Sequence, residues 1–238
     1  MSSASPKSSP SSSSSCYCPL FSSSIGRKWI VAITGICLIG FITVHLLGNL
    51  SIFLGPDMVN AYATRLHELG ALLWVARLGL LLVAGLHIYF TMLLWCENRH
   101  ACPQKYAVKN DLQTTIYARS MRLSGLVVLG FVLFHLAQFT WEWVNPEYKE
   151  WYDYMGRHDV YQMLVSAFSN PWVSGFYLLS VALLAMHLSH GIGSLFQTFG
   201  ISSAKLRPHF ERAGLIVAWI FFLGYASIPV AVFFNLLP

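Results

Sequence analysis

The stretch "WIVAITGICLIGFITVHLLGNLSIFL", residues 29–54, decides the fold of this chain. It contains no Asp, Glu, Lys or Arg, and His45 is the one imidazole within it. A helix needs about 20 mostly apolar residues to cross a bilayer, because each residue advances it by about 1.5 Å. Residues 29–54 therefore predict a transmembrane helix.

Four further stretches are long and apolar enough to span a membrane. They are residues 71–95, 123–141, 172–199 and 213–236. Of the 238 residues, 55% are hydrophobic and only 11% are charged, whereas a soluble domain usually has about 25% charged residues. We therefore expect an all-α integral membrane protein with five transmembrane helices, the first four forming an up-down bundle.

Residues 1–24 have a different composition, because thirteen of them are serine. Such a segment cannot bury enough apolar surface to fold, so we expect a disordered cytoplasmic tail. It lacks the basic start, apolar core and small-residue cleavage site of a signal peptide. The predicted domains are thus the tail, 1–24, and a five-helix transmembrane domain, 25–238.

The orientation follows from the basic residues, which favour cytoplasmic loops. The side of the N-terminus holds Lys7, Arg27, Lys28, Arg99, Lys105, Lys109, Arg119, Arg122, Lys205, Arg207 and Arg212, and the other side holds Arg65, Arg77, Lys149 and Arg157. We therefore expect the N-terminus in the cytoplasm and the C-terminus outside. The outer segment 142–170 carries Trp, Tyr and Met at spacings that predict a helix lying on the membrane surface.

Five of the nine histidines fall within the predicted spans. They are His45 on the first span, His87 on the second, His135 on the third, and His187 and His190 on the fourth. Ionisable side chains inside a bilayer are costly and usually functional. We therefore expect them to bind a metal or cofactor, the alternative being hydrogen bonds between helices.

Haem iron fits this set of ligands best. Zinc and copper sites usually add carboxylates or thiolates, but the predicted spans contain no Asp or Glu and the five cysteines do not align with the histidines. Haem iron accepts two axial imidazoles, and its porphyrin is itself apolar. Four histidines on four helices predict two b-type haems, each held by two histidines.

Depth and topology predict the two pairs. His45 and His87 lie at about 24 and 12 Å from the inner face, while His135 and His187 both lie at about 18 Å. In an up-down bundle the first and third helices are diagonal, as are the second and fourth. We therefore expect an outer haem on His45 and His135 and an inner haem on His87 and His187, through which electrons cross the membrane.

Six segments in this order suggest a known family. They are "HLLGNLSIFLG" (45–55), "NAYATRLHELG" (60–70), "ARLGLLLVAGLHI" (76–88), "RSMRLSGLVVLGFVLFH" (119–135), "DVYQMLVSAFSNPW" (159–172) and "MHLSHGIGSLFQTFG" (186–200). With them the chain resembles, over residues 25–236, the di-haem cytochrome b membrane subunit of succinate dehydrogenase and fumarate reductase. The resemblance is to the single-polypeptide, five-helix type.

The resemblance implies a function and partners. Family members anchor an FAD flavoprotein subunit and an iron–sulfur subunit at the cytoplasmic face of the bacterial inner membrane. The dicarboxylate chemistry belongs to the flavoprotein, and the membrane subunit passes electrons between the iron–sulfur clusters and a membrane quinone, typically menaquinone. The chain would thus be part of a succinate:quinone oxidoreductase of the respiratory chain and the tricarboxylic acid cycle. A homodimer of the complex is left open, and no nucleic acid is expected.

The family's axial histidines fall on the four residues paired above. Its helix IV ligand lies thirteen residues before the closing glycine, which is Gly200 here, and this selects His187. His190 would then touch a haem propionate or meet the iron–sulfur partner. Some members have a glutamate for proton transfer two residues before this ligand, where this chain has Ala185.

Four further residues are weaker candidates. Glu68 is the nearest equivalent of a glutamate at the family's quinone site, with His67 as the alternative. Arg122 resembles a family arginine at the inner end of helix III and could bind a propionate of the inner haem. Arg77 could bind a propionate of the outer haem or extend to the membrane interface.

Two hydroxyl residues share a helix face with a predicted ligand. Thr34 and Ser124 each lie eleven residues before one, His45 and His135 respectively, and eleven residues are close to whole helical turns. They could flank the inner haem or serve ordinary helix packing.

Two other functions remain open at this stage. One is a di-haem cytochrome b of another quinone-linked oxidoreductase, of the hydrogenase or nitrate reductase type. The other is a channel or structural membrane protein with hydrogen-bonded histidines between its helices.

Overall fold

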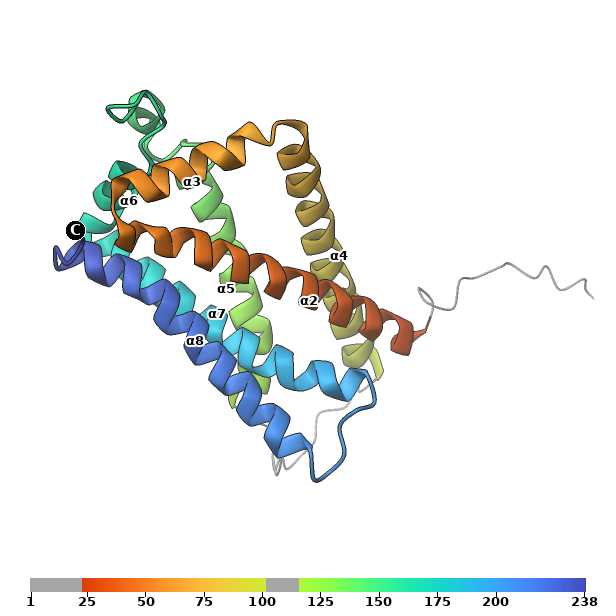
Figure 1. Cartoon of the computed structure of the whole chain (residues 1–238). Helices are drawn as coiled ribbons and strands as arrows, with labels where there is room; N and C mark the ends of the chain where they lie inside the picture. The colour runs from red at the N-terminus through yellow and green to blue at the C-terminus, as the bar shows by residue number, and fades with distance from the viewer. Residues whose placement is uncertain (1–22, 102–115) are drawn as a thin grey trace, which may run out of the picture.

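The computed structural model describes residues 23–101 and 116–238, with the helices drawn in Figure 1. In chain order these are α2 (Ser24–Asn49), η1 (Leu50–Leu54), α3 (Pro56–Glu68), α4 (Ala71–Ala101), α5 (Ile116–Phe139), η2 (Pro146–Glu150), α6 (Val160–Ser169), α7 (Pro171–Thr198) and α8 (Arg207–Phe233). The η elements are short 3-10 helices. Most of the predicted tail, 1–24, lies outside the described residues.

Five stretches of the described helices are long and apolar enough to cross a membrane. They are Ser24–Leu54, Ala71–Ala101, Ser120–Phe139, Pro171–Thr198 and Arg207–Phe233. The prediction of an all-helical membrane protein with five spans is confirmed. Two helices begin well before the apolar runs that predicted them: α2 starts at Ser24, inside the predicted tail, and α5 starts at Ile116.

Local sequence explains where the helices start and stop. The Ser23 hydroxyl accepts a hydrogen bond of 3.0 Å from the amide of Gly26 and caps α2. The Asn170 side chain caps α7 by accepting from the amide of Trp172 at 2.9 Å, and Pro171 follows as the first helical residue. Gly200, with φ of 73°, turns the chain just past α7. Such capping supplies partners for amides that have none within the helix.

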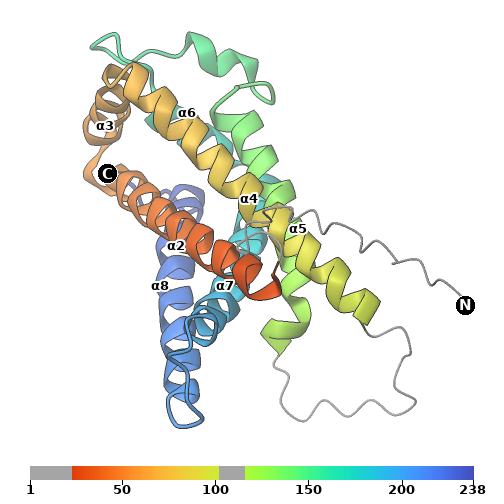
Figure 2. The same ribbon diagram turned by 90° about the vertical axis from the view of Figure 1, so that its right-hand side faces the viewer.

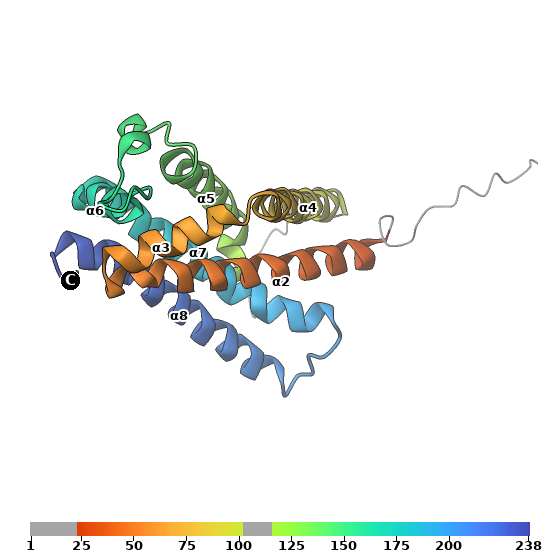
Figure 3. The ribbon, with the colours of Figure 1, turned by 45° about the horizontal axis from the view of Figure 1, so that its top comes forward.

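The packing partners include three of the four neighbouring pairs of an up-down bundle, α4 with α5 being the exception within the described residues, and a fifth helix is added. In the described part of the chain α2 packs mainly against α4, α5 against α7, and α7 against α8, while smaller contacts join α2 to α7 and α8. Figure 2 shows α7 and α8 side by side, and Figure 3 shows α2 between α4 and α8. The predicted diagonals, α2 with α5 and α4 with α7, are absent from these main contacts.

The end of the bundle that carries α3 and α6 also carries the C-terminus (Figure 1). We call it the outer end, and the opposite one the inner end, after the predicted orientation. Ile52, Val59 and Phe168 form a buried cluster here with residues of α7 and α8. This cluster fastens α3 and α6 onto the ends of the membrane helices.

The prediction of a surface-lying helix within 142–170 is wrong in its packing. A helix does form there, α6, but its apolar residues Met163, Leu164, Ala167 and Phe168 are buried. They face α3, α7 and α8 rather than a membrane surface. The amphipathic pattern was correct, but it cannot tell a protein neighbour from lipid.

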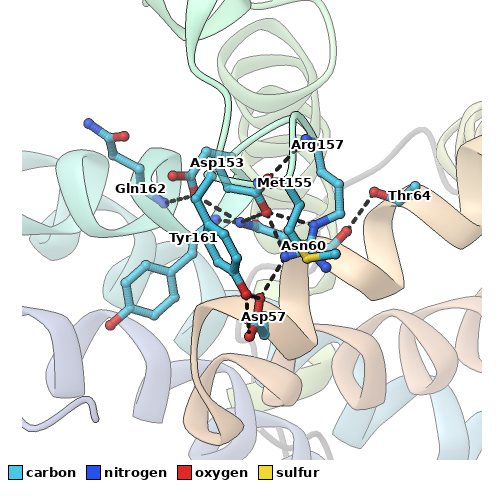
Figure 4. Close-up of polar contacts among 10 residues, drawn as sticks. Asp57, Asn60, Thr64, Asp153, Met155, Arg157, Tyr161 and Gln162 are labelled. Carbon is cyan, nitrogen blue, oxygen red and sulfur yellow. Dashed lines mark hydrogen bonds and ion pairs between the residues drawn. The ribbon is translucent and has the colours of Figure 1, made fainter.

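A polar network ties α3 to the segment before α6, as Figure 4 shows. Asn60 is fully buried and donates to the carboxylates of Asp159 at 3.0 Å and Asp153 at 3.3 Å, and it accepts from the amide of Tyr161 at 3.0 Å. Arg157 bridges Asp153 and Asp57, each at 2.7 Å. The hydrogen bond from Arg157 holds the pKa of Asp57 below its ordinary value.

Candidate functional site

The outer pair of predicted ligands comes together from α2 and α5. The ring centroids of His45 and His135 lie 5.8 Å apart. Two imidazoles bound to one metal ion, each at about 2.0 Å, have centroids roughly 6 Å apart. The spacing therefore suits two axial ligands of one iron, although the ligand role itself stays a prediction.

His87 of α4 meets α2 at a threonine followed by a glycine. Its Nδ1 lies 3.1 Å from the hydroxyl of Thr34, which is itself engaged in donating to the carbonyl of Ile30 at 2.7 Å. A Cβ added to Gly35 would lie 3.5 Å from Cε1 of the imidazole. With its own proton directed to a carbonyl, the hydroxyl oxygen of Thr34 can accept a hydrogen bond from an Nδ1–H group.

His187 of α7 meets α5 in the same way. Its Nδ1 lies 3.4 Å from the hydroxyl of Ser124, which donates to the carbonyl of Met121 at 3.1 Å. A Cβ on Gly125 would lie only 3.3 Å from Cε1 of the ring. His187 and His87 also interact electrostatically, so the predicted inner pair occupies one neighbourhood.

The two pairs lie at different levels of the bundle. Thr34 and Ser124, which touch the inner pair, each stand eleven residues before a histidine of the outer pair. At about 1.5 Å per residue the levels are roughly 16 Å apart along the helices. The equal depths predicted for His135 and His187 were wrong, because α5 begins at Ile116 rather than near 123 and so extends further inward.

His135 also has a hydroxyl partner, which sequence reasoning missed. The Tyr177 hydroxyl donates to Oε1 of Gln138 at 2.8 Å and lies 3.3 Å from Nδ1 of His135. The signal was Gln138, a buried amide three residues after His135 on the same helix face. In the Nδ1–H tautomer, from which these hydroxyls can accept, His87, His135 and His187 keep Nε2 free to bind a metal.

The donor set fits haem better than a metal held by protein alone. Among residues 23–101 and 116–238 no three His, Cys, Asp or Glu side chains gather closely enough to hold a metal ion. A pair of imidazoles suits haem iron, because the porphyrin already supplies the equatorial ligands. Ser180, seven residues before His187 on the same face of α7, has a buried hydroxyl with no partner in the described structure, and so offers an unused donor.

His190 lies within electrostatic range of Glu211 on α8. It also interacts with His187, one turn earlier on α7. Ala185, the residue that stands in place of a family glutamate, packs against the cluster of Leu46, Leu188 and Phe221. Neither residue supplies a carboxylate beside the predicted inner ligand.

The two arginines predicted as propionate partners lie beside tryptophans. At the inner end the guanidinium of Arg122 lies 5.5 Å from the ring centroid of Trp95, so it joins α5 to α4. At the outer end Arg77 lies 5.2 Å from the ring of Trp74, whose side chain is exposed. An exposed tryptophan beside an arginine is typical of the membrane interface, which favours the interfacial role for Arg77.

An open cavity of about 480 Å³ lies at the outer end, between α3 and the segment before α6. Its lining includes His67, Glu142 and His158, and Nε2 of His158 lies 3.2 Å from the Glu142 carboxylate. Glu68, the predicted quinone-site residue, is exposed and does not line it. The alternative, His67, does.

Comparison with known proteins gives one partial relationship. The chain is 25% identical over 134 residues to the succinate dehydrogenase cytochrome b558 subunit of Bacillus subtilis (strain 168). The match covers 54% of this chain and 60% of the relative, so the chain spans about three-fifths of the length of the curated relative it matches. No family model and no solved structure matches the chain.

Proposed function

We propose that the chain is the membrane-anchor cytochrome b subunit of a succinate dehydrogenase or fumarate reductase. The observation that carries the proposal is that imidazoles from four successive membrane helices lie at two levels, with the ring centroids of His45 and His135 5.8 Å apart at one level and His87 and His187 at the other. The similarity to the Bacillus subtilis cytochrome b558 subunit supports the same assignment.

In this proposal His45 and His135 hold an outer haem b, and His87 and His187 hold an inner one. Haem supplies reversible one-electron chemistry at its iron. The chain's own contribution would be to select the ligating nitrogens: hydroxyls that accept from Nδ1–H of three histidines would keep the proton there and leave Nε2 free to bind the iron. The surrounding apolar helices keep water away from both sites.

The partners and the quinone lie at opposite ends. The basic inner end, with Arg27, Arg99 and Arg122 among its residues, is the proposed docking face for the iron–sulfur and flavoprotein subunits at the cytoplasmic side. A quinone, menaquinone in the family type, would react at the outer end. There His67 and the hydrogen-bonded Glu142 and His158 can exchange the protons that accompany quinone reduction or oxidation. Glu68 remains a proposed contributor.

Purification of the complex from the bacterial membrane tests the function. We expect a reduced b-type spectrum, two haems per chain, and a co-purified flavoprotein and iron–sulfur subunit with succinate:quinone activity. A haem-containing complex with hydrogenase or nitrate reductase subunits would replace this function by the alternative. A colourless protein from haem-replete cells would exclude both.

Two neighbouring variants test the ligand assignment. His187→Ala should remove the inner haem and halve the haem content, because it deletes an axial ligand. His190→Ala should retain both haems and serves as the matched control, one turn away on the same helix. Haem content is measured against protein by the reduced pyridine spectrum. Loss of a haem in the control alone would reverse the assignment.

A further inference from the structure

Two of the membrane helices carry the same sequence pattern. Residues 34–45 of α2 read "TGICLIGFITVH", and residues 124–135 of α5 read "SGLVVLGFVLFH". Both have a hydroxyl residue first, glycine second and seventh, phenylalanine eighth and histidine twelfth. The remaining positions are mostly aliphatic in both copies.

The two copies also make equivalent contacts. The first residue of each, Thr34 or Ser124, lies within 3.4 Å of Nδ1 of a histidine on another helix, His87 or His187. Each hydroxyl is oriented by donating to a carbonyl of its own helix. The histidine that ends each copy, His45 or His135, belongs to the outer pair, whose ring centroids lie 5.8 Å apart.

The glycine in the second position explains why an imidazole can come so close. A Cβ would lie 3.5 Å from the ring at Gly35 and 3.3 Å at Gly125. Hydroxyl and missing Cβ together form a cradle for the Nδ1 side of the ring.

We propose that α2 and α5 are two copies of one haem-holding unit. Each supplies a ligand of the outer haem at its histidine and a positioning hydroxyl for a ligand of the inner haem, so Thr34 and Ser124 are positioning residues of the inner haem. The inference rests on the proposed function, since it takes the four histidines as haem ligands. It adds that the helices ligating one haem orient the ligands of the other.

The hydroxyls have a definite electronic consequence. An acceptor on Nδ1–H makes the imidazole a more basic ligand and stabilises the ferric iron, which lowers the midpoint potential of the haem. The inner pair has two such hydroxyls. The outer pair has one, Tyr177 on His135, and no hydrogen bond to the ring of His45 occurs within the described residues.

Redox titration of the intact complex, followed by its haem spectrum, tests the proposal. Thr34→Val and Ser124→Ala should each raise the midpoint potential of the inner haem and leave that of the outer haem unchanged, and the double variant should shift it further. Tyr177→Phe should move the outer haem instead. Thr43→Val is the matched control on α2, because the Thr43 hydroxyl is exposed and donates only to the carbonyl of Ile39.

The outcomes are separable. Thr34→Ser keeps the hydroxyl and should therefore leave the midpoint potential of the inner haem at its wild-type value. If only the volume of the Thr34 side chain mattered, this smaller residue would shift the potential. Retention of the outer-haem spectrum shows that each variant folds. Two haems with an inner potential unchanged in Thr34→Val and Ser124→Ala would overturn this inference and leave the proposed function standing. Absence of haem from the wild-type complex would instead remove the proposed function.

Discussion

At the scale of single residues, most buried polar side chains of the described structure have a specific partner. Ser124 and Gln138 are each 1% exposed, and both belong to the hydrogen bonds around the histidines. Asn60 is fully buried and holds the outer end together. Burying a polar group without a partner is costly, so these positions mark where the structure is most specific.

Asn60→Ala should loosen the outer end. The change removes three hydrogen bonds and leaves the Asp153 carboxylate, 7% exposed, with fewer partners. We expect a loss of about 1–3 kcal/mol in stability. Thermal unfolding of the protein in detergent measures it, and Gln162→Ala is the control because only the Gln162 backbone amide joins the network. Equal melting temperatures for wild type and Asn60→Ala would contradict the role assigned to Asn60.

Low pH should destabilise the outer end, where Asp57 and Arg157 are paired. Arg157 and Tyr154 lower the pKa of Asp57, so its ionised form is favoured in the folded state. Its contribution to stability is complete above the ordinary Asp pKa of about 3.9 and is lost as pH falls through the lowered value. Protease resistance of residues 142–160 should therefore fall below about pH 4. The loss should be smaller in Asp57→Asn, and an identical acid profile in that variant would refute the explanation.

At the scale of helices, close approach depends on small residues. α7 and α8 pack so tightly that a Cβ on Gly214 would lie 2.6 Å from the carbonyl oxygen of Ser189. α8 likewise approaches α2, where a Cβ on Gly224 would meet Leu46 at 2.8 Å. Membrane helices associate through such packing because lipid offers no hydrophobic driving force between them.

Gly214→Ala should separate α7 from α8, because the backbone oxygen it meets cannot move aside as a flexible side chain can. We expect a fall in melting temperature corresponding to about 1–3 kcal/mol. Gly191→Ala is the matched control, since a Cβ there meets nothing within 4 Å. A melting temperature as high for Gly214→Ala as for Gly191→Ala would show that the contact is unimportant.

At the scale of the whole molecule, the chain exposes apolar side chains along its spans. In the most apolar 18-residue stretch of each span, no residue of α4 is buried and only 6% of the residues of α5 are buried. Exposed leucines and aromatics on α2, α4 and α8 complete this surface. The chain thus presents to lipid what a soluble protein would bury, and its orientation in the membrane depends on charge.

Fusion of reporters to the two ends tests that orientation. With eleven basic residues predicted inside and four outside, a C-terminal alkaline phosphatase fusion should be active, because this enzyme folds only outside the cytoplasm. An N-terminal fusion of the same enzyme should be inactive. The reverse activities would place the proposed partner-binding face outside and contradict the docking model.

The sequence by itself determined the class of fold and the residues of interest. Long uncharged runs have one stable solution in a membrane, the helix, so five spans could be counted from composition. The cost of an imidazole in lipid singled out the five histidines of the spans, and the resemblance to a known family then selected His187 over His190. Residue spacing also predicted a helix within 142–170, but not that α6 packs against α3, α7 and α8.

Only the tertiary structure decided which side chains meet. The depth of His135 depended on where α5 begins, and the partners Thr34 and Tyr177 lie on helices far from their histidines in sequence. The burial of α6 and the network of Asn60 likewise required segments roughly a hundred residues apart to pack. Hydropathy and spacing describe one helix at a time, whereas a hydrogen bond between helices depends on their offset and rotation, which packing sets.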